Sequence, residues 1–311
     1  MPERDETVAV VVVTYHSEPL LPDLIKSFET GLAGLRWHLT VADNDSRDGT
    51  VATLRELAPS ATVVEMGGNL GYAAGINAAV AAAPPHTAVL VLNPDVRLGP
   101  GCVAELLRVL RSQPGTGIAV PKLVDGDGRL ITTMRREPSL PRVLGDALLG
   151  ARRAGRFPVL GEVVTDPSRY AEPAVTDWAE GSTQLISREC WDACAPWDES
   201  FFLYSEETDF ALRARDAGFA TRYVPTAQAV HLEGDSRVSP ALWTLLTVNK
   251  IRLYRRRHGP LGTAAFWSAL LLREASRAAI GRRPSRAAVR ALVSPRHVRK
   301  TPGPQLVRLA S

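Results

Sequence analysis

The stretch "VLVLNPDVRL", residues 89 to 98, is an apolar run that breaks at Asn93-Pro94-Asp95. A short continuous apolar run of this kind is typical of a strand that is buried on both faces of a parallel sheet. The break has the composition of a turn, and it carries one carboxylate, that of Asp95. A carboxylate in this place is well positioned to bind a ligand, because open α/β sheets bind ligands outside the carboxyl ends of their strands.

Strand-like and helix-like segments alternate through the first 120 residues. The strand-like segments are 8–13, 39–42, 61–65 and 88–92, and the helix-like segments are 20–32, 50–57, 71–83 and 100–110. Such a series builds a twisted sheet with helices on both faces. The sequence therefore predicts an α/β, Rossmann-like fold with a mostly parallel sheet.

Each of the four predicted strands is followed by polar or glycine-rich sequence. The segments are "TYH" (14–16), "DNDSRDGT" (43–50), "GGNLG" (67–71) and "NPD" (93–95). Ordinary turn chemistry explains any one of them, but four along one sheet edge predict a nucleotide-binding crevice. The glycines fit neither the G-x-G-x-x-G nor the G-K-[ST] pattern, which disfavours an NAD enzyme and an ordinary nucleoside triphosphatase.

The length and composition fit one large domain with an appendage. The chain has 311 residues, of which 45% are hydrophobic, so it can bury a sizeable core. Its polar N-terminus predicts no secretory signal, and its three cysteines are too few for a disulfide framework. No apolar run reaches the roughly 18 residues of a membrane span. We therefore expect a cytoplasmic protein.

The charges are distributed unevenly along the chain. Residues 250–311 hold 15 Lys or Arg and one acid, Glu274, whereas the first 249 residues hold 22 Lys or Arg and 32 acids. Apolar residues are interleaved with the arginines of the tail, which favours an anionic membrane surface over nucleic acid as the partner. A solvated basic tail is the alternative. The sequence also leaves a homodimer open.

Seven segments between residues 8 and 236 resemble, in order and spacing, an inverting glycosyltransferase of the GT-A fold, family 2, in its rhamnosyltransferase-like branch. The segments are "VVVTYHS", "VADNDSRDGT", "GGNLGYAAGIN", "VLNPDV", "DWAEGSTQLISRECWD", "FFLYSEETDFALRARDAGF" and "AVHLEGDS". Residues 1–240 are then expected to form the GT-A domain, with a nucleotide-binding half (1–120) and an acceptor and catalytic half (121–240). Residues 241–311 are expected to form a basic, partly amphipathic helical extension.

The resemblance assigns the predicted strand ends to the donor. It implies that the nucleotide sugar is bound by Thr14, Tyr15, Asp43, Asn44, Asn69, Gly71, Asn77 and Asn93. It also implies that Asp95 binds a divalent metal, Mg²⁺ or Mn²⁺, on the diphosphate. A hard cation of this kind is commonly held by one or two carboxylates plus phosphate oxygens, so one Asp at a strand end suffices. The metal would assist the leaving group, and only a base is then required.

The base is expected in "YSEETDFALRARDAG", residues 204–218. Ser205 is a good helix N-cap, and Gly218 can end the helix. Acids in a first helical turn also complement the helix dipole without any catalytic role. The resemblance places the base at Glu207, where the family has Asp, and Glu206 and Asp209 stay open as alternatives.

Two further sites follow from the resemblance. His231 is a second candidate metal or diphosphate ligand, with a structural histidine as the alternative. Trp178, Gly181 and Ser182 match the acceptor side, where the indole of Trp178 would stack on a sugar ring or belong to the core.

The implied activity is transfer of L-rhamnose from dTDP-L-rhamnose to a lipid-diphosphate-linked saccharide in cell-wall or surface-polysaccharide assembly. Such an enzyme would be attached peripherally to the inner face of the cell membrane through residues 250–311. Two alternatives stay open: a sugar-nucleotide pyrophosphorylase, which should have a Gly-rich phosphate loop near its N-terminus, and a non-catalytic nucleotide-sugar-binding module.

Overall fold

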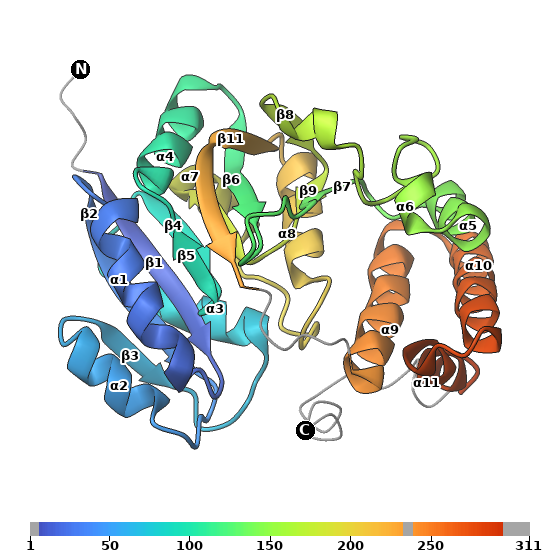
Figure 1. Cartoon of the computed structure of the whole chain (residues 1–311), viewed down its shortest axis with the longest axis horizontal. Coiled ribbons are helices and arrows are strands. Elements are labelled where there is room, and N and C mark those ends of the chain that lie inside the picture. Colours follow the sequence, from blue (N-terminus) through green and yellow to red (C-terminus); the bar gives the residue numbers. More distant parts are fainter. Residues whose placement is uncertain (1–5, 233–238, 295–311) are drawn as a thin grey trace.

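The computed structural model describes residues 6–232 and 239–294, and Figure 1 shows a sheet half beside a group of helices. The strands are β1 (Thr7–Thr14), β2 (Arg36–Asp43), β3 (Thr62–Glu65), β4 (Ala88–Leu92), β5 (Val96–Leu98), β6 (Thr116–Val124), β7 (Met134–Arg135), β8 (Ala174–Thr176), β9 (Trp178–Ala179), β10 (Thr183–Ser187) and β11 (Ala220–His231). The α-helices are α1 (Leu21–Gly31), α2 (Thr50–Leu57), α3 (Tyr72–Ala82), α4 (Cys102–Ser112), α5 (Leu140–Leu149), α6 (Ala151–Ala154), α7 (Arg188–Cys194), α8 (Glu206–Asp216), α9 (Pro240–Arg257), α10 (Pro260–Ala279) and α11 (Arg283–Leu292).

The main sheet has the strand order β3-β2-β1-β4-β10-β6-β11-β5, and β8 pairs with β11. The first four strands are parallel, as the alternating pattern predicts. β10 runs antiparallel to both β4 and β6, so the second half of the sheet is mixed. The α/β fold class is confirmed: the half that holds the predicted nucleotide loops is parallel throughout, and the other half combines the antiparallel β10 with the parallel pair β6 and β11.

β11 runs through Pro225 and continues to His231. Pro225 cannot donate a backbone hydrogen bond to a neighbouring strand. The structure accommodates it at a register shift between Val224 and Gln228. The extension carries His231 to the same end of the sheet as Asp95.

Both faces of the sheet are covered by helices. Val8, Val10 and Val12 of β1 pack into a core with α1, α2 and α4, whereas the alternate β1 residues pack into a second core with α3, α7 and α8. This two-sided burial explains the continuous β-branched run in β1, because neither face of the strand is exposed to water. All three cysteines are buried and free, as predicted.

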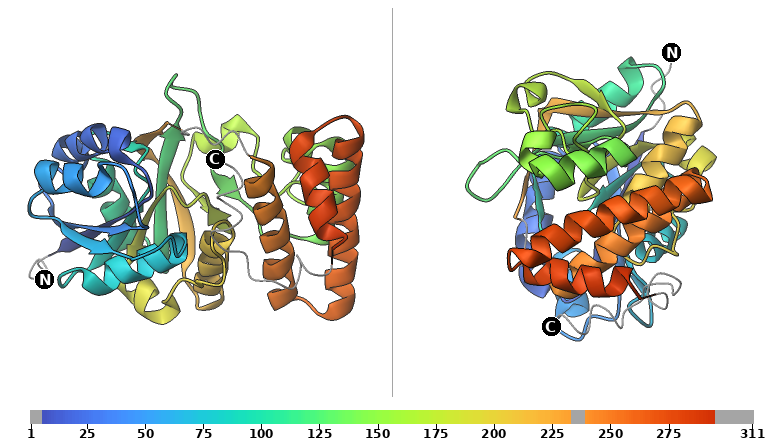
Figure 2. Two further views of the ribbon diagram at one scale, coloured as in Figure 1. Left: turned by 90° about the horizontal axis from the view of Figure 1, so that it is seen from below. Right: turned by 90° about the vertical axis from the view of Figure 1, so that its right-hand side faces the viewer.

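A separate group of helices, here named the helical lobe, consists of α5, α6, α9, α10 and α11. Its own core includes Val143 of α5, Ile251 of α9, Leu270 of α10 and Leu292 of α11. The lobe is thus assembled from two distant stretches of the chain, which lie side by side in both views of Figure 2. The predicted boundary at residue 240 separates α5 and α6 from the helices on which they pack.

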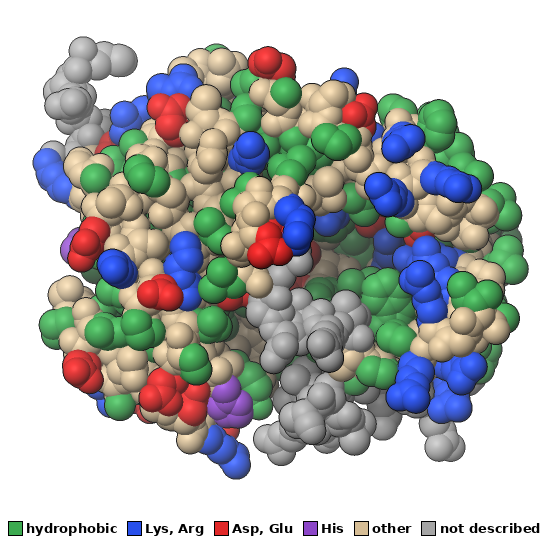
Figure 3. Space-filling model, in the orientation of Figure 1, with side chains coloured by type: hydrophobic (Ala, Val, Ile, Leu, Met, Phe, Trp, Pro, Cys, Tyr) green, Lys and Arg blue, Asp and Glu red, His purple; other side chains and the backbone are tan. Residues whose placement is uncertain are grey.

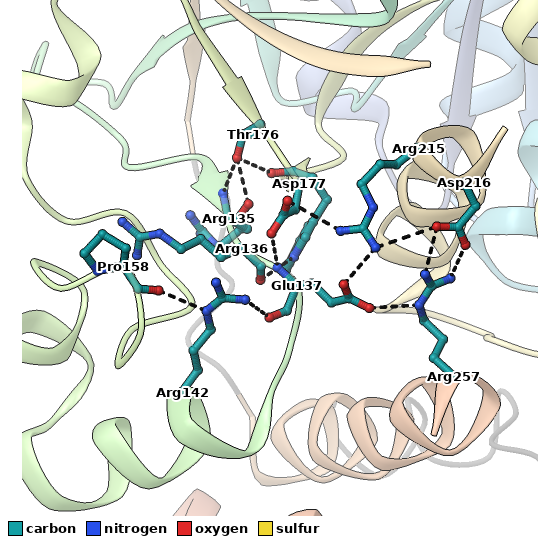
Figure 4. Close-up of polar contacts among 11 residues, drawn as sticks. Arg135, Arg136, Glu137, Arg142, Pro158, Thr176, Asp177, Arg215, Asp216 and Arg257 are labelled. Carbon is teal, nitrogen blue, oxygen red and sulfur yellow. Dashed lines mark hydrogen bonds and ion pairs between the residues drawn. The ribbon is translucent and has the colours of Figure 1, made fainter. Parts of the chain in front are cut away.

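A charged network joins the lobe to α8 (Figure 4). The carboxylate of Glu137 accepts hydrogen bonds from Arg215 of α8 at 2.8 Å and from Arg257 of α9 at 2.9 Å. Arg257 also pairs with Asp216 at 2.8 Å. The C-terminal end of α8 is therefore fixed to the lobe, while its N-terminal end carries the predicted base.

No helix among the described residues is long and apolar enough to cross a membrane.

Candidate active site

Three of the predicted nucleotide-binding residues meet where β1 and β2 end. Thr14 and Asp43 are paired in register, and the Thr14 hydroxyl donates to Asp43 Oδ1 at 2.8 Å. The backbone N–H of Ser46 donates to Asp43 Oδ2 at 2.8 Å, and that of Asn44 donates to the Thr14 carbonyl at 2.9 Å. These bonds fix the buried Asp43 carboxylate at the sheet edge. Tyr15, the next residue after β1, is 38% exposed.

Asn44, Asn69 and Gly71 shape the loop that leads into α3. The Asn44 amide donates to the Gly71 carbonyl at 3.1 Å, and the Asn69 side chain accepts from the Gly71 N–H at 3.2 Å. Gly71 has φ of 96°, and a Cβ there would lie 2.4 Å from the carbonyl oxygen of Phe202. Only glycine fits this close approach between the donor-side loop and the segment before α8.

Asn93 and the acceptor-side residues meet at Tyr72. The Tyr72 hydroxyl donates to Asn93 Oδ1 at 2.7 Å and lies 3.4 Å from the Gly181 carbonyl oxygen. The Asn93 N–H donates to the Ser182 carbonyl at 2.9 Å. Burial, followed by the charges of nearby glutamates, raises the pKa of Tyr72 well above its usual value, so this phenol stays a donor. The sequence analysis did not identify Tyr72, whose only signal is its place in "GGNLGYAAGIN".

Asp95, His231 and Glu180 form a row at the ends of their strands. His231 Nε2 lies 3.3 Å from Asp95 Oδ2, and His231 Nδ1 lies 3.4 Å from Glu180 Oε1. Burial alone would lower the pKa of His231, but bonds to the two carboxylates and their charges raise it to about 10. Glu180 is a site residue that the sequence analysis missed, although it directly precedes the predicted Gly181.

The predicted base lies in the first turn of α8. Ser205 is the residue before the helix, as predicted, but its φ is 80° and its side chain makes no capping hydrogen bond. Glu207 is half-buried, and a Cβ on Gly181 would lie 3.2 Å from Glu207 Cβ. Glycine at position 181 therefore lets the Glu207 side chain pass close to the acceptor-side segment.

Burial perturbs both glutamates of this turn. It raises the pKa of Glu207 to about 7, with backbone N–H groups at the helix start opposing the shift and the charge of Glu180 adding to it. Burial, together with the charge of Glu207, raises the pKa of Glu206 well above its usual value. A carboxyl with a pKa near 7 is suited to accept a proton at neutral pH, because it is available in its basic form without being too weak a base.

Two predicted site residues are bonded elsewhere. The Asn77 amide donates to the Trp197 carbonyl at 2.8 Å and accepts from the Trp197 N–H at 2.9 Å. Asp209 pairs with Arg213 at 2.8 Å and with Arg256 of α9 at 3.3 Å. The structure therefore does not place the side chains of Asn77 and Asp209 among the predicted site residues at the strand ends.

Trp178 lies next to the site but is only 9% exposed. Its indole N–H donates to the Arg136 carbonyl at 3.1 Å, and the Arg135 guanidinium lies 5.9 Å from its ring centroid. Little of the ring is left for stacking on a sugar, so the packing favours a role in the core.

The donor atoms fit a divalent cation that shares its coordination with a phosphate-containing ligand. Among residues 6–232 and 239–294, no group of three or more His, Cys, Asp or Glu side chains is arranged to hold a metal alone. Asp95 offers a hard carboxylate with His231 beside it, and Mg²⁺ or Mn²⁺ commonly takes one or two carboxylates plus phosphate oxygens. Residues 233–236 of the "AVHLEGDS" segment lie outside the described residues.

Comparison with known proteins agrees with this geometry. The model of the family described as "Glycosyl transferase family 2" matches residues 9–158. An N-acetylglucosaminyl-diphospho-decaprenol L-rhamnosyltransferase of Mycobacterium tuberculosis is 31% identical over 247 residues, covering 74% of this chain and 78% of the relative. The low-salt glycan biosynthesis hexosyltransferase Agl10 of Haloferax volcanii is 26% identical over 231 residues, covering 73% and 67%.

Among solved structures, the mannosyltransferase PcManGT of Pyrobaculum calidifontis, in complex with GDP-Man and Mn²⁺, has a TM-score of 0.57 at 18% identity and covers 91% of this chain and 78% of its own. The TarS structure of S. aureus has a TM-score of 0.53 at 14% identity and covers 85% and 42%. The fold is therefore that of the GT-A glycosyltransferases. The chain belongs to glycosyl transferase family 2, which confirms the family and the enzyme class that the sequence segments predict.

Proposed function

We propose that this glycosyltransferase transfers L-rhamnose from dTDP-L-rhamnose, with inversion, to a hydroxyl of a lipid-diphosphate-linked saccharide. The observation that carries the proposal is the half-buried Glu207 carboxyl, with its pKa of about 7, beside Gly181 and close to the group around Asp95. The donor and acceptor classes are supported by the M. tuberculosis relative, a rhamnosyltransferase whose name specifies a diphospho-decaprenol-linked N-acetylglucosamine.

In this proposal, different residues act on the nucleotide-sugar donor and on the acceptor. Thr14, Asp43 and Asn44 bind the nucleoside at the ends of β1 and β2. The deprotonated Glu207 carboxylate accepts the proton of the acceptor hydroxyl, whose oxygen then bonds to the anomeric carbon as the bond to the diphosphate oxygen breaks. Attack on the face opposite the leaving group inverts the anomeric configuration. Glu206, with its strongly raised pKa, stays protonated and does not compete for this proton.

A divalent cation, Mg²⁺ or Mn²⁺, would be held by Asp95, with His231 next to it. When bound, such an ion supplies Lewis-acid stabilisation of the departing diphosphate. The proposal is supported by the Asp95 carboxylate, a hard oxygen ligand, and by the Mn²⁺ bound in PcManGT and in GalNAc-T7, which has a TM-score of 0.52. Comparing Mg²⁺ with Mn²⁺ in the binding test determines which of the two metals the enzyme uses.

A lipid-linked acceptor requires the enzyme to work at a membrane. We therefore also propose that the protein is attached peripherally to the inner face of the cell membrane, as the basic C-terminal region predicts. This location would bring the strand-end site to the sugar that the lipid presents.

The test uses the full chain with dTDP-, UDP- and GDP-sugars and either Mg²⁺ or Mn²⁺. A ligand that binds only the folded state raises the melting temperature, so dTDP-L-rhamnose with metal should give the largest shift. Rhamnose should then appear on a lipid diphosphate that carries N-acetylglucosamine. A preference for a GDP-sugar would overturn the donor assignment. Release of pyrophosphate would indicate a pyrophosphorylase, and binding without transfer would indicate a non-catalytic module.

A further inference from the structure

The outer face of α10 has no charged side chain. The exposed residues of this 20-residue helix are Pro260, Leu261, Ala264, Ala265, Ser268, Leu272, Ala275, Ser276 and Ala279. They recur every three or four residues, so they form one continuous stripe along the helix. Leu261 is 89% exposed and Leu272 is 54% exposed. A surface helix in a soluble protein normally has the opposite arrangement, with its charged side chains in water.

The charged residues of α10 face inward instead. Glu274 is fully buried and accepts a hydrogen bond from the indole of Trp243 at 2.7 Å. Arg273 and Arg277 both pair with Asp146 of α5, at 2.6 Å and 2.8 Å. Two acids and two arginines thus form a network inside the lobe, and α10 cannot turn its charged side outward without breaking it.

Arginines flank the apolar stripe on one side. The exposed positions of α11 are Arg283, Arg286 and Arg290, and Arg282 in the turn before it is also exposed. α11 lies next to α10 in Figure 2, and the Arg286 side chain donates to the Ala278 carbonyl at 3.3 Å, so the arginines of α11 border the C-terminal part of the stripe. Long arginine side chains of this kind can reach phosphate groups while a neighbouring apolar surface enters the lipid boundary.

A second mixed segment borders α10 on the other side. Residues 148–159, at the end of α5 and through α6, expose Leu148, Leu149, Phe157 and Val159 together with Arg152, Arg153 and Arg156. The ion pairs of Asp146 with α10 place this segment beside the second half of that helix. It contains no acid.

These elements face the same way. In the right-hand view of Figure 2, α10 lies between α5 and α11 on the side that faces the viewer. Figure 3, which is viewed at a right angle to this face, shows Lys and Arg side chains over the helical lobe on the right-hand part of the molecule. Eight of the exposed large hydrophobic side chains belong to this part of the chain: Leu148, Leu149, Phe157, Val159, Leu261, Leu272, Ile280 and Val293.

We propose that this outer face of the lobe, formed by residues 148–159, α10 and α11, docks on an anionic phospholipid leaflet. The apolar stripe would enter the headgroup boundary, and the seven exposed arginines on its two sides would contact lipid phosphates. A second copy of the chain fits less well, because the only acid in residues 147–161 and 259–294 is the buried Glu274. In a dimer formed by two such faces, arginines would lie opposite arginines, with no acidic side chain to pair with them.

The inference goes beyond the sequence-based prediction of a basic tail. Phe266 and Leu270, which the sequence places among the tail arginines, lie in the lobe core, and Arg256 and Arg257 pair with acids of the sheet half. These four residues are therefore not part of the docking face, which instead includes the segment 148–159, about 100 residues before the tail. Docking does not depend on the donor sugar or on the base.

The experiment measures binding of the full chain to vesicles of phosphatidylglycerol and phosphatidylcholine by co-sedimentation. Two variants test the stripe, Leu272→Glu and Leu261→Glu, and one tests the rim, with Arg152, Arg153 and Arg156 all changed to Glu. Each should lower the vesicle partition coefficient by about tenfold or more. Binding of the wild-type chain should weaken as salt rises.

The matched control is Leu57→Glu, an exposed leucine of α2 at the opposite end of the molecule, which should bind vesicles like the wild type. Circular dichroism and donor binding verify that each variant is folded. Wild-type binding by both stripe variants, or equal binding to neutral vesicles, would overturn the proposal. So would a dimer in sedimentation velocity that Leu272→Glu dissociates while vesicles bind neither form. Sugar transfer to a soluble acceptor analogue is measured separately, so a failure of docking is distinguishable from a failure of the proposed activity.

Discussion

The strand-end site and the helical lobe place their charges in opposite ways. At the site, Asp43, Asp95 and Glu207 lie at the ends of strands or at the start of a helix, where we propose that the donor and the acceptor bind. In the lobe, Arg273 and Glu274 lie inside, and the outer surface of their helix is apolar. Charged side chains thus hold helices together in the lobe, whereas at the site they lie where we propose that the substrates bind.

This difference has a physical cause. The buried Asp43 carboxylate is held by hydrogen bonds from Thr14 and Ser46, whereas the buried Arg273 and Glu274 of α10 are ion-paired inside the lobe. Replacing the Glu207 carboxylate by an amide should therefore change the rate more than the stability. A substitution inside α10 should change stability and leave the chemistry of the folded enzyme intact.

Replacement of Glu207 by Gln should have the largest effect. The variant keeps the size of the side chain and loses the proton acceptor, so turnover should fall by about 10²–10⁴-fold while donor affinity is kept. Steady-state kinetics and calorimetric donor titration measure the two quantities. Asp209→Asn is the matched control, because its carboxylate pairs with Arg213 and Arg256. If Asp209→Asn or Glu206→Gln loses turnover and Glu207→Gln does not, the base is assigned to the wrong residue.

Replacement of Glu274 by Ala should unfold the lobe more easily. Removing one partner of a buried ion-paired network costs about 3–5 kcal/mol in the free energy of unfolding. Here the Trp243 indole would lose its acceptor, and two guanidinium groups would share one carboxylate, that of Asp146. Urea denaturation measures this change. Leu272 is adjacent to Arg273 in the sequence, but its side chain is 54% exposed. The free energy of unfolding of Leu272→Ser should therefore stay within about 0.5 kcal/mol of the wild type. Equal effects of the two variants would contradict the inward and outward assignment of the α10 residues.

The pH dependence of the rate tests the environment of Glu207. Since burial raises its pKa to about 7, the proton-accepting form is lost as pH falls through this value, and kcat should drop about tenfold per pH unit below it. Glu207→Gln should show no such acidic limb. An acidic limb centred near the usual value of a glutamate would show that the carboxyl is solvated in the working enzyme.

Replacement of Glu206 by Gln should have the smallest effect, and it should raise the stability of the protein where the Glu274 variant lowers it. Its raised pKa means that the folded chain holds this proton more tightly than the unfolded chain, so the stability it confers is complete at low pH and is lost as pH rises above the usual glutamate value. Glu206→Gln should therefore raise the melting temperature at pH 8 by about 2–4 °C and leave it unchanged at pH 4. A lower melting temperature at pH 8 would mean that the Glu206 charge has a stabilising partner.

The sequence predicts the edge where the strands end better than it predicts the lobe. Parallel strands bring their carboxyl ends to one edge, so the order of the segments alone places Thr14, Asp43 and Asp95 at the same edge of the sheet. Tyr72 and Glu180 were missed because their contacts, with Asn93 and with His231, join segments that are far apart in the sequence, which no local pattern encodes. Helical periodicity likewise shows which residues of α10 share a side, but not which side is buried.

The origin of the lobe in two stretches of the chain limits how this enzyme can be shortened or recombined. A chain that ends after residue 249 would lose the partners of Val143 and expose the apolar side of α5 to water. It would also lose Arg257, which joins Glu137 to the end of α8. A chimaera with another family member would therefore have to exchange residues 136–163 and 240–294 together, so that each half of the lobe keeps the surface against which it packs.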